Sequence, residues 1–229
     1  MTGARDTMLA EIRRALGRES SGPAATAVAS RLAAHPVGPV PARARGTRVE
    51  LLDRFALMVE ASAASIVKIA SPAEVPRAVA AFLVRHNLPA ELRLAPDPAL
   101  TSLPWAGTPT LSISSGPARP DDVVALTPAF AGVAETGTLV MVSDPATPTL
   151  LNFLPDTHIV LLRSHQVVGG FEEVLARLRH RYGEGTLPRT VDLITGPSRS
   201  GDIEQILQMG AHGPRRLHVL LLDDEAPQA

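Results

Sequence analysis

The sequence of 229 residues contains no cysteine, and this absence excludes several kinds of chemistry. Without cysteine the chain has no disulfide, no thiolate nucleophile and no thiolate ligand for zinc or for an iron–sulfur cluster. Its seven histidines show no HxH or HExxH spacing, which is the pattern that a histidine metal site needs. We therefore expect neither an iron–sulfur cluster nor a metal in this chain.

Lysine, aromatic residues and net charge are also scarce. Lys68 is the only lysine, and because no glycine-rich loop precedes it, a phosphate-binding P-loop is excluded. Aromatic residues make up 3% of the chain, and Lys plus Arg (22) nearly balance Asp plus Glu (23). A nucleic-acid partner needs a concentrated basic face and stacking side chains, so the composition argues against one.

Long hydrophobic runs are missing as well. The most apolar stretch, residues 123–142, contains Pro128, Glu135 and Gly137, which do not fit a membrane span. Charged residues between positions 5 and 14 interrupt the N-terminus before a signal peptide could form. With neither a membrane span nor a signal peptide in the sequence, we expect a cytoplasmic protein. We also expect a buried core, because 45% of the residues are hydrophobic.

The first 46 residues differ in character from the rest. The spacing of apolar side chains predicts a short amphipathic helix over residues 6–17. Residues 19–46 are rich in Ala, Pro and Gly without periodicity, which is typical of a tether. We therefore divide the chain into an N-terminal helix with a Pro/Ala-rich tether (1–46) and an α/β domain (47–229). The pattern leaves open whether the helix docks on its own domain or on a partner.

The domain alternates helical patterns with short apolar runs. Helices are expected after the capping box Thr47/Glu50, after Ser71, over residues 171–182, and around Ile203–Leu207. The apolar runs read as buried strands: 66–70, 92–95, 111–113, 123–126, 139–142, 158–162, 191–195 and 217–222. This alternation predicts a Rossmann-like, open and largely parallel sheet covered on both faces. The side chains expected in its core are Val140, Ile159, Leu161, Leu193, Val219 and Leu221.

Four segments carry more polar residues and glycines than a core needs: 134–138, 154–158, 195–204 and 210–215. Each has a structural interpretation, as a turn or a helix cap. Each can also contribute to a site, because loops at the carboxyl ends of parallel strands lie close together. Within 154–158, His158 is expected to be a strand-edge residue.

The functional interpretation assigns roles within these segments. Glu135 is the candidate base or nucleophile and His212 its proton partner. The candidate ligand-binding residues are Thr136, Gly137, Thr138, Thr195, Gly196, Ser198, Ser200, Asp202 and Gly213. We expect Glu135, Thr136, Ser198, Ser200, Asp202 and His212 to converge on one pocket at the carboxyl ends of the strands.

The same segments resemble the LUD-domain family over about residues 47–223. The stretches that carry the resemblance are AETGTLV (134–140), LPDTHIV (154–160), TGPSRSGDIE (195–204) and GAHGP (210–214). The resemblance implies a fold similar to the sugar-phosphate isomerase and CoA-transferase group. It also implies a role in oxidising L-lactate to pyruvate beside two partner proteins that carry iron–sulfur clusters.

Three functions are compatible with these observations. The chain can be a component of a lactate-oxidising system whose motif residues form an interface or a small-molecule pocket. Alternatively it is a stand-alone enzyme of CoA-transferase-like or carboxylate-activating type that uses Glu135, an analogy at the level of fold. In the third, the polar motifs only cap and turn the chain of a scaffold.

Overall fold

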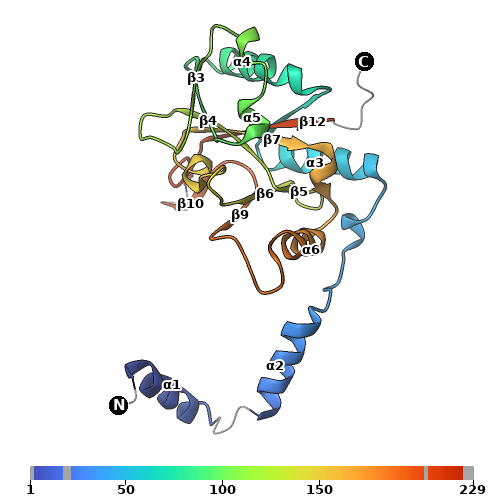
Figure 1. Ribbon diagram of the computed structural model, residues 1–229, viewed down its shortest axis with the longest axis vertical. Helices are drawn as coiled ribbons and strands as arrows, with labels where there is room; N and C mark the ends of the chain where they lie inside the picture. Colours follow the sequence, from blue (N-terminus) through green and yellow to red (C-terminus); the bar gives the residue numbers. More distant parts are fainter. Residues whose placement is uncertain (1–2, 18–21, 204–205, 224–229) are drawn as a thin grey trace. The chain divides into compact units, whose positions relative to one another are not determined.

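A computed structural model describes residues 3–17, 22–203 and 206–223 (Figure 1). Contacts divide the chain into two compact units, residues 1–39 and residues 40–229. Residues 40–46, which we expect in the tether, therefore pack with the α/β unit. The reason is a contact between residues far apart in the chain. Ala44 is buried, and its backbone lies so close to Gly169 that a side chain at position 169 would not fit.

The described residues of the N-terminal unit form two helices. Helix α1 (Ala4–Ala15) matches the predicted amphipathic helix, whereas α2 (Gly22–Ala34) was not predicted and lies within the segment that we expect to be a tether. Alanine has the highest helix propensity, so an alanine-rich segment can be helical without an apolar stripe. The apolar side chains of Met8 and Ile12 in α1 and of Leu16, which caps its C-terminus, are exposed.

The α/β unit contains four α-helices among its described residues: α3 (Arg48–Ala61), α4 (Val75–Arg85), α5 (Pro98–Thr101) and α6 (Phe171–Tyr182). Helix α3 begins with the predicted capping box of Thr47 and Glu50. A 3₁₀ turn, Pro72–Glu74, precedes α4. The spacing of Ser71 and Glu74 also predicts a capping box, but these two residues do not form one. The Ser71 hydroxyl donates to the Glu74 carboxylate instead of accepting from the backbone. None of the helices in the described residues is long and apolar enough to cross a membrane.

A six-stranded sheet forms the centre of the unit. All of its strands are parallel, in the order β1-β12-β7-β4-β2-β3. Its strands are β1 (Ser65–Ile69), β2 (Glu91–Leu94), β3 (Ser112–Ser115), β4 (Val124–Pro128), β7 (Thr157–Arg163) and β12 (Arg216–Leu222). The predicted α/β fold with a parallel sheet is confirmed.

A second, four-stranded sheet is mixed and was not predicted. It has the order β8-β5-β6-β9, and β5 and β9 both run antiparallel to β6. Its strands are β5 (Ala131–Val133), β6 (Thr138–Val142), β8 (Val167–Val168) and β9 (Val191–Ile194). The short β5 and β8 carry too few residues to show a hydrophobic period.

Alternate side chains along the strands of the large sheet are buried on its two opposite faces. Ile159 and Leu161 pack toward α4 and α5, while Val160 and Leu162 pack toward α3 and the small sheet, as the period of two in a strand requires. Helix α6 covers the opposite face of the small sheet. Figure 1 shows this order of layers, from α4 through the two sheets to α6.

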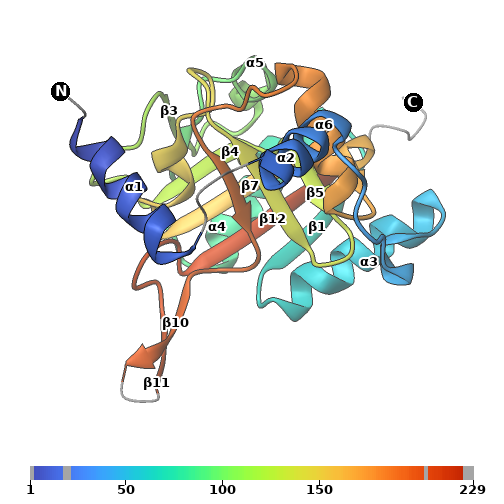
Figure 2. The same ribbon diagram turned by 90° about the horizontal axis from the view of Figure 1, so that it is seen from below.

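Two expectations about the C-terminal half are wrong. The segment expected to be a helix around Ile203–Leu207 forms a β-hairpin, β10 (Arg199–Ile203) with β11 (Ile206–Met209), which projects from the sheets in Figure 2. Its apolar residues span less than two helical turns, a length at which periodicity cannot distinguish a helix from strands. Leu193, expected in the core, is 56% exposed because β9 is the last strand of its sheet. The other five predicted core residues are buried.

Candidate functional site

Most of the predicted site segments meet at a pocket of about 280 Å³, which we call the amino-edge pocket. It is lined by residues 152–153, 193–199 and 212–214, together with His158 and Leu217. Residues 212–214 precede β12, and His158 and Leu217 are the second residues of β7 and β12. The pocket therefore lies at the amino ends of the parallel strands, and the expected position at the carboxyl ends is wrong. Segment 195–199 follows β9, which belongs to the other sheet.

Five predicted ligand-binding or catalytic residues line this pocket together: Thr195, Gly196, Ser198, His212 and Gly213. A hydrogen bond from the Ser198 amide to the Pro214 carbonyl (2.9 Å) holds the two segments side by side. A Cβ atom at Gly213 would lie 3.4 Å from the Cβ atom of Ser198. The hydroxyl of Ser198 and the exposed imidazole of His212 thus face a shared space.

His158 is the most deeply buried polar residue of the pocket, with no exposed surface. Its Nε2 atom lies 2.7 Å from the Thr127 hydroxyl on the neighbouring strand β4, and its Nδ1 atom has no hydrogen-bond partner among the described residues. Burial lowers the pKa of His158 to about 3. The imidazole is therefore neutral near pH 7 and can donate or accept one hydrogen bond to a ligand. We expected His158 to be a strand-edge residue, but it is fully buried.

A chain of hydroxyl groups joins the pocket to the turn before β6. The hydroxyls of Thr136 and Thr138 lie 2.6 Å apart, and the hydroxyl of Thr138 lies 2.7 Å from that of Thr195. Thr138 is 2% exposed, so these hydrogen bonds satisfy a hydroxyl that water does not reach. Thr136 and Thr138 thus position Thr195 without lining the pocket.

Glu135 lies outside the amino-edge pocket. Its carboxylate accepts hydrogen bonds from the Arg43 guanidinium at 2.9 Å (Nε) and 2.7 Å (Nη2), and its amide donates to the Gly169 carbonyl. Glu135 thus sits on the β8 side of β5, and β6 separates it from β9 and the residues that follow. The expected convergence of Glu135 with Ser198 and His212 does not occur in this arrangement.

The remaining predicted residues have other positions. Ser200 pairs with Gln208 in the β10–β11 hairpin and does not line the pocket. The side chain of Asp202 falls outside the described residues. Gly137 has a φ of 68° in the turn before β6, where a Cβ atom would lie 2.6 Å from the backbone of α3. Gly196, at φ 78°, would meet the Ser62 carbonyl in the same way. Both positions require glycine for packing against the end of α3.

Sequence reasoning gave no site role to several lining residues of the pocket, among them Asn152, Phe153 and Arg199. Asn152 is buried and its amide donates to the Asp192 carboxylate at 3.2 Å. The sequence signal that could have pointed to Asn152 is a polar residue next to the apolar Leu151, just before the LPDTH stretch. With Arg199, a neutral buried imidazole and the hydroxyls of Thr195 and Ser198, the pocket can hold a small polar molecule that carries a negative group.

The fold and this pocket define a layered α/β protein whose parallel sheet is of the Rossmann-like type. The chain belongs to the LUD domain family, because the sequence model of that family matches residues 106–222. The resemblance predicted from the sequence motifs is thereby confirmed.

Individual relatives agree with this membership. Lactate utilization protein C of Bacillus pumilus is 38% identical over 94 residues, which is 41% of this chain and 39% of that protein. Lactate utilization protein C of Shouchella clausii is 32% identical over 93 residues, 41% of each chain. An uncharacterized protein of Neisseria meningitidis is 36% identical over 91 residues, 40% of this chain and 38% of that protein. The match spans about two fifths of each relative.

A solved structure shares the fold. The crystal structure of a DUF162 family protein from Deinococcus radiodurans matches with a TM-score of 0.56 and 24% identity. The match covers 78% of this chain and 99% of that one. At this identity the likeness concerns the fold alone.

Proposed function

We propose that this chain is a component of a system that oxidises L-lactate to pyruvate, acting with iron–sulfur partner subunits and holding no cluster itself. The observation that carries the proposal is the likeness to proteins named lactate utilization protein C, 38% identical in the B. pumilus case. Oxidation of lactate releases two electrons, and the chain has no cysteine to bind an electron-accepting cluster. Partner subunits would therefore carry the electrons.

Within this system the amino-edge pocket would bind a small ligand. The support is its chemistry: the hydroxyl of Ser198, the imidazoles of His158 and His212, and the guanidinium of Arg199 line one cavity. The alternative, an enzyme that uses Glu135, has less support because that carboxylate is engaged by Arg43 and lies outside the pocket.

Growth on L-lactate as the sole carbon source tests the role. We expect a deletion of the gene in its host to abolish this growth and the wild-type gene to restore it. Ser198→Ala and His212→Ala should fail to restore growth, whereas Ser200→Ala, a matched change outside the pocket, should restore it. Normal growth of the deletion strain would contradict the proposal.

Glu135→Gln separates the two functional classes. The pocket hypothesis predicts that this variant supports growth on lactate, with a small loss of stability from the weakened pair with Arg43. Loss of growth at an unchanged melting temperature would favour the enzyme that uses Glu135.

The partner subunits would contact helix α1. Its exposed stripe of Met8, Ile12 and Leu16 is apolar, and covering such a stripe is favourable. We expect Ile12→Asp in the full chain to weaken co-purification with the iron–sulfur subunits. Ala10→Asp, on the opposite side of the same helix, is the matched control. Equal co-purification of both variants would contradict this assignment.

A further inference from the structure

A cavity of about 720 Å³ in the α/β unit is separate from the amino-edge pocket, and none of the predicted site residues lines it. We call it the arginine pocket, after Arg163, Arg177 and Arg181, which line it. It lies where β4 and β7 end and the chain passes into the small sheet, with α6 on the other side. This is the carboxyl edge of a parallel sheet, where ligands of open α/β proteins bind.

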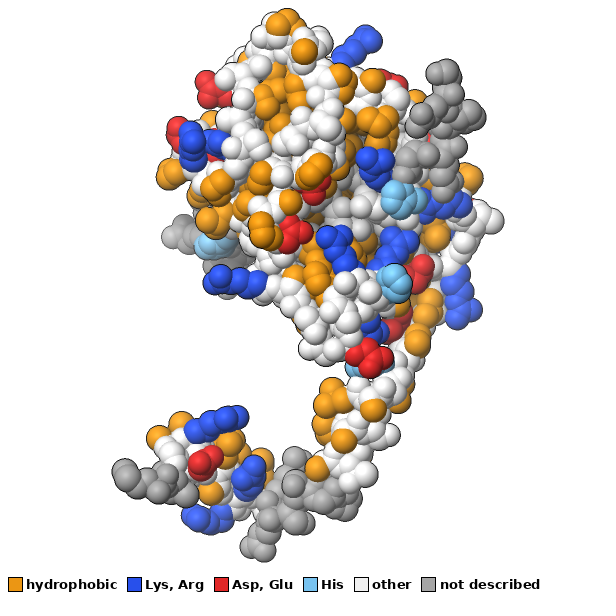
Figure 3. Space-filling view, viewed as in Figure 1, with side chains coloured by type: hydrophobic (Ala, Val, Ile, Leu, Met, Phe, Trp, Pro, Cys, Tyr) orange, Lys and Arg blue, Asp and Glu red, His pale blue; other side chains and the backbone are white. Residues whose placement is uncertain are grey.

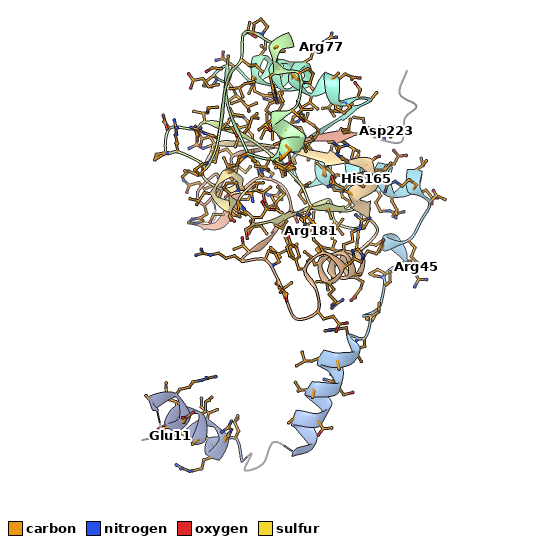
Figure 4. All side chains as sticks on the ribbon, viewed as in Figure 1. Glu11, Arg45, Arg77, His165, Arg181 and Asp223 are labelled. Atoms are coloured by element: carbon orange, nitrogen blue, oxygen red, sulfur yellow. The ribbon has the colours of Figure 1, made fainter. Side chains whose placement is uncertain are left out.

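The charges that line the pocket are mainly positive. Three arginines and two histidines, His165 and His180, face two aspartates. Figure 3 shows basic and histidine side chains gathered on this face, and Figure 4 places His165 and Arg181 there.

Both aspartates are already engaged by the protein. Asp97 accepts a hydrogen bond from the Ala99 amide at 2.7 Å and so caps α5. Asp144 accepts from the Ala146 and Thr147 amides at 2.7 and 3.0 Å, and its second oxygen lies 3.8 Å from the Arg181 guanidinium. Neither carboxylate neutralises Arg163 or Arg177.

The arginines differ in how they are held. Arg177 donates to the carbonyls of Gln166 and His165 at 3.0 and 3.2 Å, and burial lowers its pKa. Its charge is therefore fixed in place and partly removed from water, where an anion would stabilise it. Arg181 lies over the ring of Phe130, 5.7 Å from its centre.

Arg163 is the residue that points to a ligand. It is half-buried, and its guanidinium has no hydrogen-bond acceptor or ion-pair partner in the part of the chain that the structure describes. A guanidinium presents a planar fork of donors that matches a carboxylate or a phosphate. A half-buried arginine with open donors, next to a second partly desolvated arginine, forms such an anion site.

We propose that the arginine pocket binds an organic anion, whose carboxylate or phosphate group is held by Arg163 with Arg177 and Arg181 beside it. The cavity lies in the size range that holds a small organic molecule and is larger than an inorganic ion needs. Pro128, Ala129, Phe130 and Leu161 supply apolar wall for the rest of the molecule. The proposal stands on this geometry and does not rest on the function proposed above.

Ligand-induced thermal stabilisation of the purified full chain tests the proposal. The probes are L-lactate, pyruvate and citrate as carboxylates, AMP and glucose 6-phosphate as phosphates, and glucose as the neutral control, all at constant ionic strength. We expect a saturable rise in melting temperature with at least one anion and none with glucose. A response confined to one group of probes identifies the anionic group that the pocket recognises.

Variants localise the binding. Arg163→Gln should weaken the affinity for the responding anion by about 10- to 100-fold, the worth of a charge-assisted hydrogen bond. Arg77→Gln, the same charge change on the exposed face of α4 (Figure 4), should leave it unchanged. If Arg163→Gln does not fold, Arg181→Gln, a change of the same kind at a more exposed position of the pocket, takes its place as the pocket variant. Absence of a saturable response to every anion, or equal affinity in the pocket variants and Arg77→Gln, would overturn the proposal.

Discussion

Two buried histidines should make the stability of the α/β unit fall steeply in mild acid. His158 has no exposed surface, and burial lowers its pKa to about 3. His218 is 6% exposed, its Nδ1 atom lies 2.8 Å from the Ser65 hydroxyl, and its ring stacks on that of Phe82. Burial first, and the nearby His86 second, lower its pKa to about 4.

The sign of the effect follows from proton binding. Both folded-state pKa values lie below the ordinary value of 6.5, so the unfolded chain binds more protons than the folded one below that pH. The stability is fully present above pH 6.5 and is lost as the pH falls toward the folded-state values. At about pH 5 each histidine accounts for a loss of about 2 kcal/mol, or about 4 kcal/mol together.

Urea unfolding at about pH 7.5 and about pH 5 measures this loss. We expect His158→Gln, which can keep a hydrogen bond to Thr127, to reduce the difference between the two pH values by about 2 kcal/mol. His180→Gln changes an exposed histidine and should leave that difference as in the wild type. If His158→Gln shows the full wild-type difference, the buried neutral imidazole is not its source.

Three further predictions concern packing and hydrogen bonds. Gly137→Ala should lower the free energy of unfolding by more than about 2 kcal/mol because its Cβ atom would collide with the backbone of α3. Gly183→Ala, at φ 89° in open space, should lower it by about 1 kcal/mol. Chemical denaturation compares the two variants, and equal losses would refute the close approach. Leu220→Ala in the core should lower the free energy of unfolding by about 2–5 kcal/mol, and Leu193→Ala at an exposed position by less than about 0.5 kcal/mol. Both are measured in the same way. A large loss for Leu193→Ala would contradict the position of Leu193 on the edge strand. Thr138→Val should cost about 0.5–1.5 kcal/mol because the buried Thr138 hydroxyl loses its hydrogen bonds to Thr136 and Thr195. Unchanged thermal unfolding would show that the hydroxyl chain is not needed.

The part of the site that could be predicted from the sequence is the part encoded by local turn chemistry. The segments around Ser198 and His212 stand out as glycine- and proline-flanked polar turns, and they do meet in one pocket. Glu135 stands out for the same reason, yet its carboxylate binds Arg43. A turn motif shows that a polar residue leaves the core, but the strands that flank it decide where that residue goes.

The arginine pocket had no signature in the sequence. Arg163 ends a strand, and Arg177 and Arg181 lie one helical turn apart on α6, where basic residues fit the negative end of the helix dipole. Their common role as pocket lining arises only when α6 packs against the small sheet. A charged residue at a helix end looks the same in sequence whether it faces water or a cavity.

The parallel sheet could be predicted from the sequence alone, because buried parallel strands are continuous apolar runs and interleaved helices show their own period. The start of α3 could likewise be predicted from its capping box. The small mixed sheet, the β10–β11 hairpin and the edge of the sheet at which the pocket lies became known only from the three-dimensional fold. These features depend on which strands become neighbours and in which direction they run, and that choice is made by packing between residues far apart in the chain.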